Sequence, residues 1–457
     1  MKPRMILKRS KIHNEPEILN VAFHGGHSRV KILRAAIFHT PRNPFLTANA
    51  LVGYADGALA IENGNVVDCG DYSSVAKTYP EAAVNDLRGG YILPGFIDTH
   101  VHFPQVRILG GLGYGLLDWL EQLALPEEAR LSDAACASAI AQEFVAALAA
   151  DGTTTALAFG SHFAGATAAL FTAAEQRGLR IFSGLVLSNR LLLPELNQTP
   201  DAAYWDSKVL IDRFGSLRYA VMPRFAVATS EAMLSVCQTL IREDSRLLFT
   251  THINENRQEI EQVAALFPWA EDYLAVYERF DLIGARSVLA HNVHPGTDEL
   301  QRMAARGASI THCPSSNAAL GSGIFPLRRH VESNVRIALG TDVGGGTGFG
   351  MLKEGLQAYL MQRVASEPIT LSPAQMLYLA TRAGAEALGI ADQTGDFEKG
   401  KTADFVCLQP PEGSVLAGVL NRVDSCDRII AALFTLAGAE SVREVCVAGH
   451  RIVDRRN

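Results

Sequence analysis

Short apolar runs alternate with helical stretches through the middle of the chain. Eight runs are rich in apolar and β-branched residues: Tyr91–His102, Thr153–Gly160, Arg180–Leu187, Arg218–Val227, Leu247–Asn254, Ser287–His294, Ala308–Pro314 and Arg336–Val343. Segments with helical periodicity, such as Ser132–Ala150 and Ala166–Gly178, follow most of them. This alternation is typical of a parallel sheet with crossover helices. Eight units over roughly 290 residues favour a (β/α)8 barrel, with an open doubly wound sheet as the alternative.

The two ends of the chain show a different pattern. Short strands joined by turns are expected there: Val30–Phe38, Gly57–Glu62, Asn65–Asp68, Gly395–Leu408 and Val442–Val453. These β-rich flanks predict a small β-sandwich domain that both chain ends build together, from residues 29–90 and 392–457. The catalytic barrel would then span 91–391, and residues 1–28 would form a poorly ordered N-terminal extension.

Composition and charge exclude several classes of protein. Of the 457 residues, 48% are hydrophobic and only 19% are charged, which argues against a disordered chain. The net charge of −7 does not favour binding to nucleic acid or to anionic lipid. We find no apolar run of about 20 residues and therefore expect no membrane span. Seven irregularly spaced cysteines without a Cys-x-x-Cys pair, and no secretory signal, indicate a cytoplasmic protein.

Histidine and carboxylate side chains stand at the ends of four of the expected strands, where the working residues of (β/α)8 enzymes cluster. The side chains concerned are His100, His102, His252, Glu255, His291 and Asp342. His100 and His102 lie two residues apart on an extended strand, so both imidazoles point to one face. Two nitrogens placed in this way can bind one ion at about 2.0–2.1 Å each. An isolated His-x-His pair is more often structural, but His252 and Asp342 at other strand ends favour a metal site.

Glu255 follows His252 by three residues and has two interpretations. It is either an ordinary first-turn glutamate favoured by the helix dipole, or a proton shuttle beside the metal. Nearby, Glu259 and Glu261 are expected to face solvent. Four further histidines are expected to be structural: His162, His294, His312 and His330.

Lysine usage bears on the number of metal ions. Lys208 is the one lysine between Lys77 and Lys353, and it precedes the expected fourth strand, which has none. A binuclear site in such a barrel commonly needs a modified lysine at the end of that strand. The pattern therefore favours a single ion.

Several of these segments together resemble the amidohydrolase superfamily. They are Tyr91–His102 (YILPGFIDTHVH), the later His252, His291 and Asp342, and Glu398–Phe405 (EKGKTADF). The resemblance implies a zinc- or iron-dependent barrel with a composite β domain. It covers the chain from about Val30 onward.

Within that superfamily, further segments are similar to the guanine deaminases: His102–Gln105, Leu117–Glu121, Pro223–Phe225, Thr251–Asn256, Thr311–Asn317 and Leu339–Gly345. This similarity implies hydrolysis of the C2 amino group of guanine to give xanthine and ammonia, a step of purine catabolism, by a homodimer. One Zn²⁺, or Fe²⁺, would be held by His100, His102, His252 and Asp342. Glu255, His291 and Asp342 would act in catalysis, and Gln105, Arg224, Phe225 and His252 would bind substrate. The loop 344–350 is more glycine-rich than this family leads us to expect.

The chemistry of Gln105, Arg224 and Phe225 also suits the binding of a purine. Arg224 offers a cationic fork to a carbonyl oxygen, Gln105 a donor and an acceptor to a ring edge, and Phe225 an aromatic face. Alone, Arg224 is better explained by a surface ion pair and Phe225 by core packing, but their adjacency at the end of the expected fourth strand favours substrate binding. Two alternative functions stay open: a superfamily deaminase of another heterocycle (a pterin, 8-oxoguanine or a triazine), and a non-catalytic scaffold.

Overall fold

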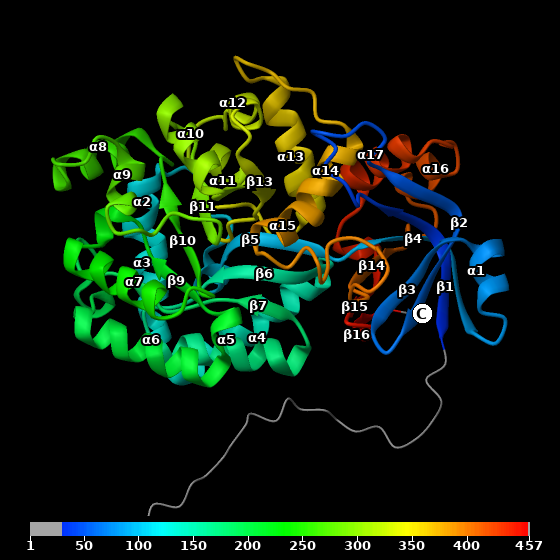
Figure 1. The fold of residues 1–457 in the computed structure, drawn as a ribbon, viewed down its shortest axis with the longest axis horizontal. Helices are drawn as coiled ribbons and strands as arrows, with labels where there is room; N and C mark the ends of the chain where they lie inside the picture. The colour runs from blue at the N-terminus through cyan, green and yellow to red at the C-terminus, as the bar shows by residue number, and fades with distance from the viewer. Residues whose placement is uncertain (1–29, 456–457) are drawn as a thin grey trace, which may run out of the picture.

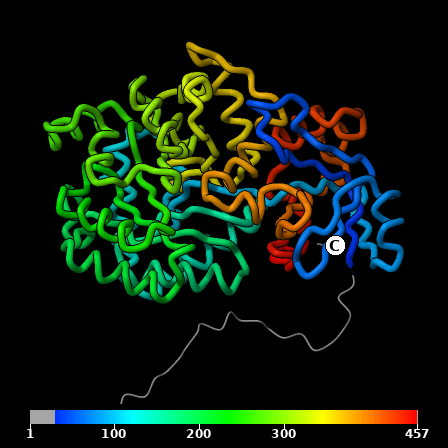
Figure 2. The backbone as a smooth tube through the Cα atoms, in the orientation of Figure 1, coloured from blue at the N-terminus to red at the C-terminus, as the bar shows by residue number. Residues whose placement is uncertain are grey.

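The structure is a computed structural model that describes residues 30–455; the extension expected at 1–28 lies outside the described residues. Figure 1 shows two parts, a barrel of strands and helices and a β-rich part beside it. The N-terminal and C-terminal segments lie side by side in the β-rich part, as the blue and red ends of the tube in Figure 2 show.

The barrel wall consists of parallel strands, and all eight runs expected from the sequence contribute to it. The strands are β5 (Phe96–His102), β6 (Thr153–Phe159), β7 (Arg180–Phe182), β8 (Val186–Leu187), β9 (Ala220–Pro223), β10 (Leu248–Ile253), β11 (Ser287–His291), β12 (Ser309–His312) and β13 (Arg336–Leu339). The third run is divided into β7 and β8. Backbone hydrogen bonds of 2.8 Å from the His102 N–H to Val343 O, and from the Asp342 N–H to His100 O, join the last strand end to the first.

Helices follow most of the barrel strands. Those of the barrel and its loops are α2 (Leu116–Trp119), α3 (Leu125–Ala129), α4 (Ala134–Ala150), α5 (Ala164–Arg177), α6 (Pro200–Phe214), α7 (Glu231–Glu243), α8 (Arg257–Leu266), α9 (Tyr273–Glu278), α10 (Thr297–Arg306), α11 (Pro314–Ala319), α12 (Leu327–Glu332), α13 (Met351–Arg363), α14 (Pro373–Ala380) and α15 (Arg382–Ala387). Side chains cap several of them: Ser230 Oγ, for example, accepts from the Met233 N–H at the start of α7. Their apolar faces pack on the strands in one continuous buried cluster.

The β-rich part is a single seven-stranded sheet. Its strands are β1 (Lys31–His39), β2 (Val52–Glu62), β3 (Asn65–Asp71), β4 (Ala83–Pro94), β14 (Phe405–Leu408), β15 (Val442–Val447) and β16 (His450–Asp454), with α1 (Tyr72–Thr78), α16 (Val415–Leu420) and α17 (Cys426–Leu436) beside it. Their order is β16-β15-β14-β4-β1-β2-β3, so β4 and β14 bring the two chain ends together in antiparallel register.

The stretch Tyr91–His102, expected as one strand, contains two elements. Tyr91–Pro94 ends β4 in the seven-stranded sheet, and β5 of the barrel begins at Phe96. The residue between them is Gly95, where a Cβ atom would lie 2.2 Å from Thr154 Oγ1. Only glycine allows this close approach, and the chain passes from one sheet to the other at that point.

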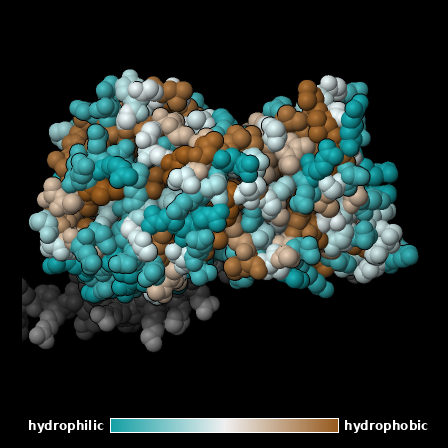
Figure 3. All heavy atoms as spheres, turned by 90° about the horizontal axis from the view of Figure 1, so that it is seen from above, coloured by the Kyte–Doolittle hydropathy of each residue, from teal (hydrophilic) through white to brown (hydrophobic). Residues whose placement is uncertain are grey.

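Figure 3 shows hydrophobic side chains in separate patches among hydrophilic ones on the face in view. Among residues 30–455, no single helix is long and apolar enough to cross a bilayer. One pair of helical segments, Leu116–Ser132 with Ala134–Ala150, is long and apolar enough when taken together, but the two segments meet at a bend of 117°.

Candidate active site

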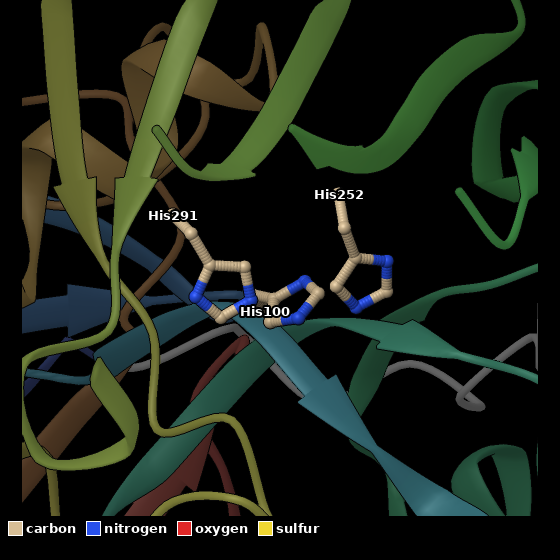
Figure 4. Close-up of side chains that lie close together, drawn as sticks. All are labelled: His100, His252 and His291. Carbon is tan, nitrogen blue, oxygen red and sulfur yellow. The ribbon is translucent and has the colours of Figure 1, made fainter. Parts of the chain in front are cut away.

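Three imidazoles and one carboxylate converge where the barrel strands end. The Nε2 atom of His102 lies 3.2 Å from the Nε2 atoms of both His100 and His252. The Oδ1 atom of Asp342 lies 3.2 Å from His100 Nε2 and 3.3 Å from His102 Nε2. Figure 4 shows His100 and His252 turned toward one another, with His291 close by.

This spacing fits a metal ion. Tetrahedral ligands at about 2.0–2.1 Å from an ion lie about 3.3–3.4 Å from one another. The Nε2 atoms of His100 and His102 share one acceptor, Asp342 Oδ1, and His102 Nε2 also lies against His252 Nε2, so hydrogen bonds alone do not account for this convergence of nitrogens. Burial lowers the pKa of His100 to about 4 and that of His252 well below its usual value, so both rings are neutral, the form that binds metal.

Polar contacts behind the cluster fix its orientation. His252 Nδ1 donates to the backbone oxygen of Arg224 at 2.5 Å, which leaves Nε2 free to face the cluster. Asp98, fully buried, accepts from the backbone N–H groups of His100 and Thr341 at 3.1 Å each. One carboxylate thereby holds together the ends of β5 and β13, which carry His100 and Asp342.

Glu255 and His291 lie next to this cluster. Glu255 Oε2 is 3.5 Å from His291 Nε2, and Ser322 Oγ donates to Glu255 Oε1 at 3.4 Å. Burial, reinforced by the charge of Asp342, raises the pKa of Glu255 well above its usual value. His291 Nδ1 contacts Asn317 Oδ1 at 3.0 Å, and its Nε2 lies 3.8 Å from Asp342 Oδ2. A carboxyl group that can hold a proton therefore lies beside the His–Asp cluster.

Glu259 is buried, so the expectation that it faces solvent was wrong. Its Oε2 accepts from the backbone N–H groups of Glu255 at 3.1 Å and Asn256 at 3.2 Å, and Tyr273 Oη donates to its Oε1 at 2.6 Å. It forms the capping box of α8 with Asn256, which turns the carboxylate back toward the chain. Glu261, two residues further along α8, is exposed as expected.

The side chains expected to bind substrate border the same pocket as the cluster. Gln105, Arg224 and Phe225 line it together with His102, His252, Glu255, His291 and Asp342. Apolar side chains form the rest of its wall: Leu116, Trp119, Leu120 and Leu320. Arg224 is only 3% exposed, which excludes the surface ion pair considered above.

Sequence reasoning missed a buried carboxylate, Glu128 on α3. Its Oε1 accepts from Gln105 Nε2 at 2.7 Å, and its Oε2 accepts from Arg224 Nη1. Glu128 follows Pro126 and Glu127, where first-turn glutamates are common, so nothing in the local pattern marks it. The backbone N–H of Gly344, in the glycine-rich loop, donates to Gln105 Oε1 at 3.0 Å.

Of the four histidines expected to be structural, His162 belongs to the same network. Its Nε2 contacts Glu128 Oε2 at 3.1 Å, and it follows β6 directly, so its place at a strand end was a usable signal. His312 and His330 instead stack on Phe325, and His294 Nε2 donates to Ser322 O at 2.7 Å.

Lys208 lies on α6, away from the cluster, and its Nζ donates to Glu243 Oε2 at 3.0 Å. The residues that line the described pocket include no lysine.

Comparisons with known proteins agree with this arrangement. Residues 91–452 match the model of the amidohydrolase family. The chain is 55% identical over 429 residues to a probable guanine deaminase of Deinococcus radiodurans, covering 92% of this chain and 98% of that protein. It is 36% identical over 440 residues to the guanine deaminase of Escherichia coli, covering 94% and 99%. A solved structure of E. coli guanine deaminase has a TM-score of 0.90 at 35% identity and covers 93% of this chain and 100% of that one. The expected (β/α)8 barrel with an additional domain is confirmed.

Proposed function

The chain belongs to the amidohydrolase family, and from that premise we propose that it hydrolyses the C2 amino group of guanine to give xanthine and ammonia. The observation that carries this proposal is one buried pocket with the His–Asp cluster and Glu255 at one end and Gln105, Arg224 and Phe225 at the other. The similarity to enzymes named guanine deaminase supports the same substrate.

A single Zn²⁺ is the proposed cofactor, with Fe²⁺ as the alternative, held by His100, His102, His252 and Asp342. Three imidazoles and one carboxylate suit zinc, and their spacing supports four-coordination. The absence of a lysine among the pocket residues favours one ion over two. When bound, such an ion supplies Lewis acidity that lowers the pKa of a water molecule toward about 7.

The end of the pocket that is lined by Gln105, Arg224 and Phe225 would bind the substrate. The Arg224 guanidinium offers N–H donors to O6 of guanine, and Gln105 contacts the purine edge. Phe225 presents an aromatic face to the ring, and His252 borders the reacting end. The apolar side chains of Trp119 and Leu320 form part of the wall around this space.

Glu255 is the proposed proton carrier. It takes one proton from the attacking water and gives it to the ring nitrogen next to C2, which makes C2 more electrophilic. The water oxygen then bonds to C2, with His291 and Asp342 holding it by hydrogen bonds. The proton of the added hydroxyl group then passes through Glu255 to the amino nitrogen. The C2–N bond breaks as the C2=O bond forms, and ammonia leaves. One water is consumed for each xanthine formed.

We also propose a cytoplasmic homodimer that binds neither nucleic acid nor membrane. All seven cysteines are free thiols, which supports a reducing compartment. Size-exclusion chromatography with light scattering measures the assembly directly.

Incubation of the purified protein with guanine tests the function. We expect xanthine by ultraviolet absorbance and one ammonia per guanine. A pterin, 8-oxoguanine and an amino-triazine are assayed in the same way as alternative substrates. If one of them releases ammonia faster than guanine does, that compound, and not guanine, is the preferred substrate.

A further inference from the structure

Glu128 contacts two of the side chains that line the proposed substrate end of the pocket, Gln105 and Arg224. Its carboxylate accepts from Gln105 Nε2 at 2.7 Å, from His162 Nε2 at 3.1 Å and from Arg224 Nη1. These donors come from different parts of the barrel: Gln105 from the turn Phe103–Ile108 after β5, His162 from the end of β6, and Arg224 from the end of β9. One side chain on α3 thus ties together three strand ends.

We propose that Glu128 is a positioning residue that sets the selectivity of the pocket for a purine with a 6-oxo group. The proposal rests on the proposed function, because it concerns how the same pocket recognises its substrate.

The orientation of Gln105 follows from its two partners. A carboxylate only accepts hydrogen bonds, so the Gln105 amide must turn its NH₂ group to Glu128. The Gly344 N–H only donates, so the amide oxygen must face the glycine-rich loop. A side chain that offers a donor and an acceptor in isolation therefore has its oxygen engaged and has one N–H left for the pocket. A Cβ atom at position 344 would lie 2.7 Å from the backbone oxygen of Gln105, so this contact requires glycine there.

Arg224 is held in the same way. One of its Nη atoms is bound to Glu128, and the remaining N–H groups of the fork are left for a ligand. Both side chains are almost fully buried, with 3% of the Glu128 side chain and 4% of the Arg224 side chain exposed. A buried pair with this geometry loses conformational freedom before substrate arrives, so less is lost on binding.

The charges also balance. Burial alone would raise the pKa of Glu128, but the Arg224 guanidinium and His162 outweigh it and hold that pKa well below its usual range. Burial lowers the pKa of His162, whose Nε2 faces the Glu128 carboxylate and whose Nδ1 lies 2.9 Å from Ser188 Oγ. The negative charge of the Glu128 carboxylate and the positive charge of the Arg224 guanidinium offset each other. This end of the pocket therefore presents N–H donors without net charge.

Such a site suits a neutral carbonyl oxygen. A 6-oxo purine satisfies the donors, whereas 2-aminopurine has no group at C6 and 2,6-diaminopurine places an amino group there. Sites built to hydrogen-bond a substrate atom discriminate strongly against analogues that lack it, because buried donors are then left unpaired. Glu128 holds both donors in place, so the discrimination depends on it.

The test compares Glu128→Gln with Glu127→Gln. Gln has nearly the shape of Glu but turns an NH₂ group toward Arg224 or Gln105, which are donors themselves. Glu127 is the adjacent carboxylate, also buried, and it pairs with Arg130 at 2.8 Å outside the network. kcat and KM are measured for guanine and 2-aminopurine, with the metal content of each protein.

For E128Q we expect a fall of about 100-fold in kcat/KM for guanine, mostly through KM, with unchanged metal content. The ratio of kcat/KM for guanine over that for 2-aminopurine should fall at least about 10-fold. E127Q should stay within about twofold of the wild type on both measures.

An E128Q protein with an unchanged guanine to 2-aminopurine ratio overturns the proposal, whatever its absolute rate, since a merely structural defect lowers both substrates alike. If E128Q does not fold, Glu128→Asp keeps the charge and shortens its reach, and an unchanged ratio there overturns the proposal too. A wild type that releases no ammonia from guanine refutes the proposed function instead, so the two failures are distinguishable.

Discussion

His252 Nδ1 donates a hydrogen bond of 2.5 Å to the backbone oxygen of Arg224. A side chain of the His–Asp cluster and the residue that carries the buried guanidinium are therefore in direct contact, and they lie at the ends of the neighbouring strands β10 and β9. The contact joins the His–Asp cluster to the residue whose guanidinium lines the same pocket. Under the proposed function, a purine bound by Arg224 would lie against this cluster.

Removing the carboxylate of Glu255 should separate metal binding from catalysis. Glu255→Gln keeps the side-chain volume but holds no transferable proton, so kcat should fall by about 10²–10⁴-fold. The metal content, measured by atomic emission, should equal that of the wild type because Glu255 is not among the four proposed ligands. Turnover within a factor of a few of the wild type would remove Glu255 from the role of proton carrier.

Removing one ligand should release the ion. His102→Ala leaves three of the four side chains, and we expect metal content below about a tenth of the wild-type value after dialysis, with loss of turnover. A chelator should inactivate the wild type, and added Zn²⁺ should restore it. The matched control is His450→Ala, on the exposed surface of β16, which should keep both metal and activity. Full metal occupancy in the His102 variant would contradict the ligand set.

Changing the guanidinium of Arg224 should weaken guanine binding. Arg224→Lys keeps a cation opposite Glu128 but loses the planar fork, whereas Arg224→Ala would leave a buried carboxylate unpaired at a cost of about 3–5 kcal/mol. We expect KM for guanine to rise about 10- to 100-fold with a smaller change in kcat. Arg242→Lys, at an exposed ion pair with Asp281, is the control and should leave KM unchanged. An unaltered KM in the Arg224 variant would count against its contact with O6.

Burial of Glu354 should make the stability of the protein depend on pH. This side chain, on α13, accepts from the Ser315 N–H at 3.1 Å, and burial raises its pKa from 4.5 to about 8. Between these two values the folded chain keeps a proton that the unfolded chain has lost. The contribution of Glu354 is therefore fully present below about pH 4.5 and is lost as the pH rises toward 8, by up to about 1.4 kcal/mol per pH unit.

Thermal unfolding of Glu354→Gln and of the wild type, measured from pH 5 to pH 8, tests this dependence. The difference in Tm between the two should shift in favour of the variant as the pH rises. A difference that is constant over this range would show that Glu354 is ionised in the folded protein.

The sequence predicted the cluster because each of its members follows from a local rule. His100 and His102 share a face by strand periodicity, and His252, His291 and Asp342 each end a strand of the barrel, whose ends meet at one rim. Glu128 obeys no such rule: its partner Arg224 lies 96 positions away, and only the folded chain brings them together. Glu259 was misjudged because a capping carboxylate has the same sequence pattern as an exposed one. Gly95 escaped notice because the need for a bare backbone arises from Thr154, on the neighbouring strand.

The reaction of guanine in H₂¹⁸O, followed by mass spectrometry of the purine product and by ammonia release, tests hydrolysis at C2 most directly. We predict xanthine that carries one ¹⁸O atom, formed in equal amount to ammonia, and formation of this product at least about 100-fold more slowly by Glu255→Gln. Guanine recovered unchanged, or xanthine without the label, would contradict a hydrolysis at C2.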